Sequence, residues 1–192
     1  MVKEAGIDDL KPRPARCSGW LGYRECFVPG PMRPDEWRAG SIYVELDRDE
    51  PRLYDVLGSL HMVVSDRFRE VMEALAPGQC QFLPIPVRSP SGRHLADYWY
   101  LHVVNWVECM DMDKSIYIID PDGSRHYMIC HINAQRIQNA IMIGRVAEEG
   151  VNCFIRDSMR LVIQRAKLTN VSIYDFPCTN APLSKKRPGA AH

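Results

Sequence analysis

The sequence has no excess of charge of either sign. Its 192 residues contain 24 Lys and Arg against 24 Asp and Glu, so the formal net charge is zero. A protein that binds nucleic acid gains much of its affinity by neutralising phosphates, and usually has a basic excess. The balance therefore argues against a nucleic-acid partner. Hydrophobic residues make up 46% and charged residues 25% of the chain, as in an ordinary globular domain with a core.

Long apolar runs are also missing. No segment approaches the roughly 20 apolar residues of a membrane-spanning helix, and residues 1–16 lack the apolar centre of a signal peptide. We therefore expect a soluble cytoplasmic protein without a membrane partner. Residues 1–16 and the basic segment 179–192 have little apolar material to bury, which predicts flexible ends. Between them we expect one domain over residues 17–178, with a variable part, 17–60, and a core, 61–178.

Motifs for metal binding and catalysis are absent as well. The seven cysteines stand at positions 17, 26, 80, 109, 130, 153 and 178, without a Cys-x-x-Cys pair. Disulfide frameworks and structural zinc sites normally use closer cysteines, so we expect reduced thiols packed as small hydrophobic groups. The chain has no His-x-x-x-His pair, no Gly-rich phosphate loop and no Gly-x-Ser-x-Gly elbow. We predict no metal, no cofactor and no catalytic residue.

Two segments have the periodicity of amphipathic helices. Residues 65–75 begin with Ser65, a suitable N-cap, and residues 157–167 repeat the same spacing of apolar side chains. The apolar faces consist of Phe68, Val71, Met72 and Leu75, and of Met159, Val162, Ile163 and Ala166. The two segments align at a constant offset of 91 residues, and the match extends from 80–87 to 171–176. This indicates a duplicated helix–strand unit, or a chance agreement between two helices of one register.

The other regular segments are predicted strands. Residues 98–110 are aromatic and β-branched on both alternating faces, which predicts a central, largely buried strand. Pro84 and Pro86 should confine a strand over 80–87 to a sheet edge or make it irregular. Shorter strands are expected at 41–46, 141–146 and 171–176.

A hairpin is predicted where residues 116–119 and 126–132 flank the turn sequence Asp120-Pro121-Asp122-Gly123. Hairpin connections between strands, bracketed by helices, predict an α+β fold with a mostly antiparallel sheet. They do not favour a doubly wound parallel sheet.

Three stretches carry a family resemblance. They are Val63-Val64-Ser65-Asp66-Arg67-Phe68, the segment from Tyr98 to Asp111 with its Asn105-Trp106-Val107-Glu108-Cys109 end, and Lys114-Ser115. In these motifs and in their order, residues 37–177 resemble a bacterial family of immunity proteins. The family is known as immunity protein family eleven and was earlier classed as a domain of unknown function. His102 and Trp106 depart from the family pattern, which more often has Asn and a smaller aliphatic residue there.

The resemblance implies an antitoxin of interbacterial competition. Such an immunity protein binds and neutralises a cognate polymorphic toxin encoded by a neighbouring gene, and nucleases are among the toxins associated with the family. Acidic residues concentrate in the centre of the chain: Glu108, Asp111, Asp113, Asp120 and Asp122. We predict these carboxylates as the partner-binding site, because an acidic patch steers an inhibitor onto a basic surface. The alternative is that they are turn residues facing water.

Two other functions stay open at the level of sequence. One is an enzyme that reverses toxin damage with Cys109, Cys130 or His131, although the missing motifs favour a binding protein that is not an enzyme. The other is a self-associating structural module, and a homodimer is compatible with every pattern above.

Overall fold

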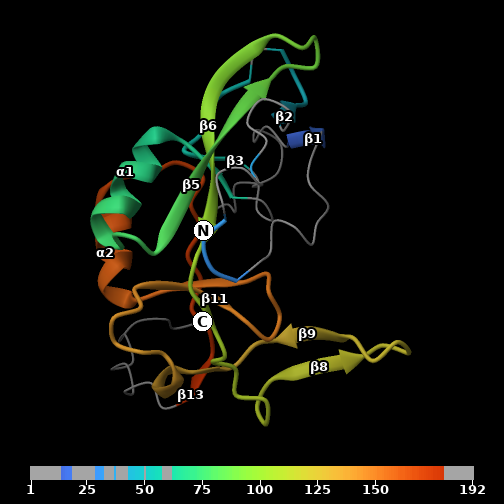
Figure 1. The fold of residues 1–192 in the computed structure, drawn as a ribbon, viewed down its shortest axis with the longest axis vertical. Helices are drawn as coiled ribbons and strands as arrows, with labels where there is room; N and C mark the ends of the chain where they lie inside the picture. The colour runs from blue at the N-terminus through green and yellow to red at the C-terminus, as the bar shows by residue number, and fades with distance from the viewer. Residues whose placement is uncertain are drawn as a thin grey trace, which may run out of the picture.

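The computed structural model describes residues 14–18, 29–32, 37, 43–49, 51–57 and 62–179, which form an α+β fold (Figure 1). The predicted fold class is confirmed, since most strand pairs are antiparallel and two main helices pack beside the largest sheet. The ends predicted to be flexible, 1–16 and 179–192, lie almost entirely outside the described residues.

The largest sheet has six strands. Their order across it is β1 (Pro14–Ser18), β2 (Tyr43–Leu46), β5 (Cys80–Arg88), β6 (His94–Val103), β4 (Val63–Val64) and β3 (Val56–Leu57). Only β2 and β5 run parallel, and the other neighbours are antiparallel. Strand β6 lies inside the sheet and is buried from Tyr100 to Val103, so the prediction of a central aromatic strand is confirmed.

The predicted bounds of that strand, 98–110, were wrong. Strand β6 starts earlier and ends at Val103, and β7 (Trp106–Val107) belongs to another sheet. The reason lies at Asn105, whose amide Nδ2 donates to the Ile143 carbonyl at 3.1 Å and to Gln79 Oε1 at 3.2 Å. These bonds turn the chain away from β5 and towards β11 (Ile143–Val146), with which β7 pairs in parallel.

Of the two alternatives predicted for residues 80–87, the edge position was wrong, because β5 lies between β2 and β6. The irregular strand is present, since the pairing of β5 with β6 shifts register between Val87 and Arg88. Strand β2 pairs with β5 only at Val87 and Arg88, beyond both prolines. The Pro84 carbonyl accepts a hydrogen bond from Trp37 Nε1 at 2.8 Å. The N and O of one strand residue face the same side, so the nitrogen of Pro84 also faces away from β6. On that side β2 does not pair with Pro84, so the missing N–H costs no hydrogen bond between strands.

Two helices cover one face of the large sheet (Figure 1). Helix α1 (Asp66–Leu75) starts as predicted, with Ser65 Oγ accepting from the Phe68 N–H. Helix α2 (Asp157–Arg165) starts at the same offset of 91 residues and buries Met159 and Ile163, as α1 buries Phe68 and Met72. The helical part of the proposed duplication is therefore present.

The strand part of that duplication is not present. Residues 171–176 form no strand, although 80–88 form a long one. Instead, Val171 and Ile173 pack against the core beneath the helices without pairing to a neighbouring strand. The apolar side chains of this segment are thus partly buried by packing alone.

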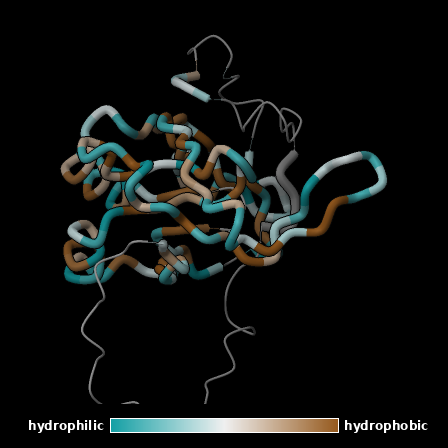
Figure 2. Tube along the Cα trace, turned by 90° about the horizontal axis from the view of Figure 1, so that it is seen from below, coloured by the Kyte–Doolittle hydropathy of each residue, from teal (hydrophilic) through white to brown (hydrophobic). Residues whose placement is uncertain are grey.

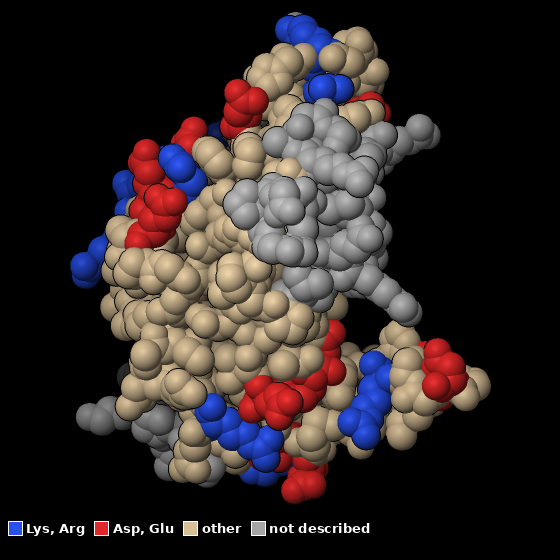
Figure 3. Space-filling model, in the orientation of Figure 1, with Lys and Arg blue, Asp and Glu red and all other residues tan. Residues whose placement is uncertain are grey.

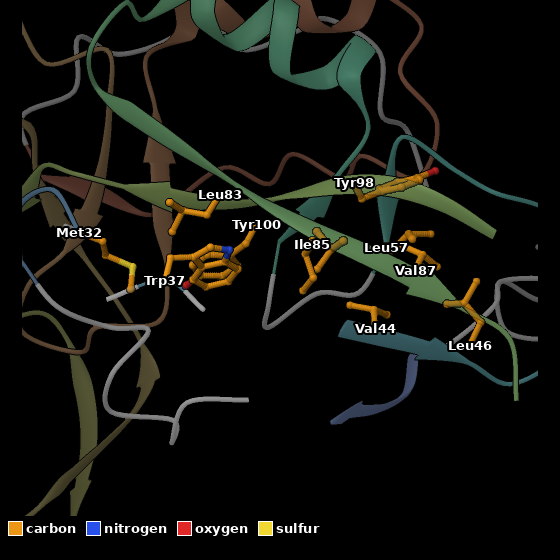
Figure 4. Packing of buried hydrophobic residues seen from close by; sticks show 11 residues of the cluster. Met32, Trp37, Val44, Leu46, Leu57, Leu83, Ile85, Val87, Tyr98 and Tyr100 are labelled. Carbon is orange, nitrogen blue, oxygen red and sulfur yellow. The ribbon is translucent and has the colours of Figure 1, made fainter. Parts of the chain in front are cut away.

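The core is built on both faces of the large sheet. Leu101 and Val103 of β6 pack with the two helices, and the alternate residues Tyr98 and Tyr100 face the opposite cluster (Figure 4). There the Trp37 ring stacks on Tyr100, with centroids 5.5 Å apart and planes 7° apart. Alternation along one central strand thus supplies two separate cores.

A third cluster lies under the smaller sheet, whose strand order is β12 (Cys153–Ile155), β11 and β7. Phe154 packs over Gly144 so closely that a Cβ on the glycine would lie 2.5 Å from the ring. The buried Cys109, Met110 and Ile132 belong to the same cluster. This third core carries the segments from which the predicted hairpin starts.

A buried carboxylate joins the two helical regions. Asp55 accepts hydrogen bonds from Ser65 Oγ at 2.7 Å, Thr169 N at 2.7 Å and Thr169 Oγ1 at 2.9 Å, and Arg67 lies 3.4 Å away. Burial raises the pKa of Asp55, but these hydrogen bonds and the Arg67 charge lower it more, so the pKa lies below its ordinary 3.8. Asp55 therefore ties the N-cap of α1 to the segment after α2.

We predict that Ile163→Ala lowers the free energy of unfolding by about 2 to 5 kcal/mol, because it leaves a cavity beneath α2. Leu161→Ala is the matched control, since Leu161 lies on the same helix and is 58% exposed. Urea unfolding of both variants checks this. Equal losses would show that α2 does not pack as described.

We also predict that Asp55→Asn lowers the free energy of unfolding near neutral pH by about 2 to 3 kcal/mol, because charged hydrogen bonds are lost. A lowered pKa means that the carboxylate stabilises the fold above its unfolded pKa, and that this contribution disappears as pH falls through the folded pKa. The difference between wild type and variant should therefore shrink below about pH 4. A difference independent of pH, or an equal loss in the exposed Asp97→Asn, would contradict this assignment.

Candidate functional site

A two-stranded hairpin projects from the body of the molecule (Figures 1 and 2). Strand β8 (Ile116–Ile119) pairs antiparallel with β9 (Arg125–Ile129), which confirms the predicted hairpin, although β9 ends at 129 instead of 132. The turn is closed by the Asp120 N–H, which donates to the Ser124 carbonyl at 2.9 Å. Gly123 has a φ of 83°, a conformation that favours glycine.

The hairpin exposes apolar side chains. Its large exposed residues are Ile116, Ile118, Ile119, Met128 and Ile129, with exposed fractions between 41% and 67%. Apolar strand segments lead to a hydrophilic tip in Figure 2. The sequence analysis missed this surface, because it predicted the hairpin from the turn at 120–123 and did not ask which side chains of the two strands would be exposed. The useful signal was that a hairpin of this length cannot bury both faces on itself.

Aromatic residues stiffen part of the hairpin. The rings of Tyr117 and Tyr127 lie opposite each other, with centroids 5.5 Å apart, and both are half-buried. The guanidinium of Arg125 lies 5.3 Å from the centroid of the Tyr117 ring. Such cross-strand aromatic and cation–π pairs each stabilise a ribbon by about 0.5 to 1 kcal/mol.

The root of the hairpin is closed by three hydrogen bonds, which we call the root ring. The Asp111 N–H donates to the His131 carbonyl at 2.8 Å, and the His131 N–H donates to Ser115 Oγ at 3.0 Å. Ser115 Oγ donates in turn to the Asp111 carbonyl at 2.8 Å. The ring thus joins the segment before β8 to the segment after β9.

The Asp111 side chain fastens the root to the body. Its carboxylate accepts from Thr179 Oγ1 at 2.5 Å, and Lys114 Nζ lies 3.6 Å away. The hydroxyl of Thr179 and then the Lys114 charge hold the pKa of Asp111 below its ordinary value. Thr179 belongs to β13 (Cys178–Thr179), which pairs in parallel with β10 (Ile132–Asn133) just after the hairpin.

The predicted acidic residues do not form one patch. Glu108 and Asp113 are exposed in the segment that leads to the hairpin, and Asp111 is part of its root. Asp120 and Asp122 lie at the tip, where Asp120 Oδ2 is 2.6 Å from His126 Nε2 and Asp122 Oδ1 accepts from the Ser124 N–H at 2.9 Å. The Ser124 hydrogen bonds lower the pKa of Asp122.

The charge pattern of the hairpin is therefore acidic at both ends. Figure 3 shows acidic groups at the outer end and near the body, with basic groups between them. Arg125 of β9 offsets part of the negative charge of Asp120 and Asp122 in the turn. Asp111 is best explained as a positioning residue, while Glu108, Asp113 and Asp122 face solvent.

The thiols considered as nucleophiles have the wrong acidity for that role. Burial raises the pKa of Cys109 to about 12 and that of Cys130 to about 11. A cysteine nucleophile acts as a thiolate and needs a lowered pKa in an electropositive setting. Glu148 adds to the increase at Cys109 and Glu149 at Cys130. His131 is engaged through its backbone in the root ring.

Metal-binding clusters and membrane-spanning helices are absent from the described part of the chain. No group of three or more His, Cys, Asp or Glu residues is arranged there to hold a metal ion. None of the helices there is long and apolar enough to cross a membrane.

An α+β domain whose prominent feature is an anchored hairpin with an exposed apolar surface has the construction of a protein-binding module. The chain belongs to the Imm11 immunity protein family, whose model matches residues 29–176. The match includes both helices, the central strand and the whole hairpin. The family resemblance predicted from the sequence is confirmed, and family membership supports an immunity-protein role. No curated protein matches the chain.

We predict that Ser115→Ala loosens the root ring, because the hydroxyl both donates and accepts there. Loss of these bonds should cost about 1 to 2 kcal/mol and raise local amide exchange in β8 and β9 about tenfold. Hydrogen–deuterium exchange measures this, with the exposed Ser172→Ala as control. Unchanged exchange in both strands would mean that the root ring does not hold the hairpin.

Proposed function

We propose that this chain is a cytoplasmic immunity protein that binds a cognate toxin directly and blocks its active surface. The observation that carries the proposal is the match to the immunity protein family over residues 29–176. The toxin would be the C-terminal domain of a polymorphic toxin used in interbacterial competition and encoded by a neighbouring gene. A nuclease fits this description, because its substrate-binding surface is basic.

The acidic residues supply the long-range part of this interaction. Glu108, Asp113 and Asp122 are exposed at the two ends of the hairpin. Carboxylates in this arrangement attract a basic protein surface from a distance and raise the association rate. Asp120 Oδ2 lies 2.6 Å from His126 Nε2, and Asp111 positions the hairpin root. These two residues contribute to the field of the site and to its shape.

Protection by occlusion needs no catalytic group. The alternative, enzymatic reversal of toxin damage through Cys109 or Cys130, is disfavoured by the raised pKa values of both thiols. The two mechanisms differ in an observable way. An occluding inhibitor protects in proportion to complex formed, whereas a repair enzyme protects at low concentration without a stable complex.

The test is to co-express the chain with the toxin domain encoded by the adjacent gene, and to mix the two purified proteins. The proposal predicts restored growth and a stable stoichiometric complex in size-exclusion chromatography. Protection without a complex would favour repair. Neither protection nor a complex would refute the proposal.

We predict that the triple variant Glu108→Lys, Asp113→Lys and Asp122→Lys binds this toxin domain at least about tenfold more slowly, with a weaker dependence on salt. Stopped-flow association at low and high ionic strength measures both effects. All three side chains are exposed, and only Asp122 loses a hydrogen bond, the one from the Ser124 N–H, so the thermal midpoint should fall only slightly.

The matched control for this charge reversal is Asp97→Lys. Asp97 is exposed near the start of β6. The connection between β5 and β6 lies at the opposite end of the molecule from the β8–β9 hairpin (Figure 1). The control should bind at the wild-type rate. Equal rates for the triple variant and the wild type would leave the three carboxylates as solvated turn residues.

A further inference from the structure

The apolar surface of the hairpin is not explained by steering through charge. Five large apolar residues are exposed on only two short strands. Single exposed apolar residues are ordinary, but a concentration of them on one element marks an interaction site. In the described part of the chain, neither β8 nor β9 pairs with any other strand.

We infer that the β8–β9 hairpin is the part of this protein that enters the toxin, and that its apolar side chains fill a cleft with basic groups at its floor and at its rim. The inference rests on the proposed function and deepens it, because it assigns the contact to one element and states the chemistry of the surface that receives it.

The distribution of side chains favours a cleft over a flat surface. Successive strand residues point to opposite faces, so Ile116 and Ile118 lie on one face of β8 and Ile119 lies on the other. All three are exposed. A flat partner would cover one face and leave the other in water. A cleft that receives the hairpin from its tip covers both.

The charges at the tip select among possible occupants. Asp120 and Asp122 lie in the turn, so they would enter any partner first. Entry into a lipid bilayer would place these carboxylates in hydrocarbon first, which is costly. Contact with the same hairpin of a second copy would bring the acidic tip to another acidic tip, or to the root, where Glu108, Asp111 and Asp113 outnumber Lys114. A different protein whose apolar cleft has basic groups at its floor and at its rim matches the apolar strands, the acidic tip and the acidic root.

The root ring gives the hairpin the rigidity that insertion requires. Asp111, Ser115 and His131 fix both strands at the point where they leave the body. The facing rings of Tyr117 and Tyr127 hold the strands together further out. A preorganised element loses less conformational entropy on binding, so more of its apolar burial appears as affinity.

The test uses the double variant Ile118→Asp and Met128→Asp. Both positions are exposed, so circular dichroism and thermal midpoint should match the wild type. The probe is a catalytically inactive form of the toxin domain encoded by the adjacent gene. Its Kd, measured by calorimetry, should increase at least about tenfold. The control Leu161→Asp, exposed to a similar extent on α2, should bind as the wild type does.

Hydrogen–deuterium exchange of the wild type supports the same test without a substitution. Amides of residues 116–129 should become protected in the complex, which also covers the case in which the double variant fails to fold. If the wild type itself forms no complex, the proposed function fails and this inference fails with it. If the wild type binds but residues 116–129 stay unprotected and the double variant binds equally well, only this inference is overturned.

Other occupants would give different results. Analytical ultracentrifugation would detect a wild-type dimer, and vesicle flotation with anionic lipid would detect membrane binding. If the double variant lost either of these and kept its affinity for the toxin domain, the hairpin would belong to a second copy or to a membrane. Either result would overturn the inference.

Discussion

Three hydrogen bonds among Asp111, Ser115 and His131 determine what this protein can present to a partner. A free two-stranded ribbon is marginally stable in water. The root ring converts such a ribbon into an extension of the folded body, and the bond from Thr179 to Asp111 connects it to a strand that follows much later in the chain. Exposed apolar residues on the hairpin can then be held in one arrangement without a partner.

The hairpin root is held in place by the elements that precede it in the chain. The central strand β6 supplies two cores through its alternating faces, and Asn105 then turns the chain into the smaller sheet. Gln79 fixes this change of direction, because its Oε1 also accepts from the Met142 N–H at 2.8 Å. Asn105, Asp111 and Ser115 belong to the motifs that carry the family resemblance. In this structure they act as positioning residues, while the exposed hairpin side chains form the contact surface that we propose.

Local rules predicted the elements that depend on neighbours in sequence. The periodicity of Phe68 and Met72 located α1, and the turn at Asp120 to Gly123 located the hairpin. The errors came from distant partners. Strand β6 ends at Val103 because Asn105 binds Gln79 and Ile143. Strand β5 can lie inside the sheet because β2 pairs with it only beyond its two prolines. Neither relation is visible in a local pattern.

The site was predictable only in part. The acidic residues were chosen because they are close in sequence, but the hairpin separates them by its own length and commits Asp111 to the root. The exposure of Ile118 and Met128 could not be read from hydrophobicity, since a buried strand has the same composition. What distinguishes them is that no neighbouring strand covers the ribbon in the described part of the chain.

The most direct test of this account is a crystal structure of the chain bound to the toxin domain encoded by the adjacent gene. Residues 116–129 should lie inside a cleft of the toxin, with Ile118 and Met128 buried and the root ring unchanged. A complex in which the hairpin remains in solvent, and the toxin binds elsewhere on the chain, would contradict it.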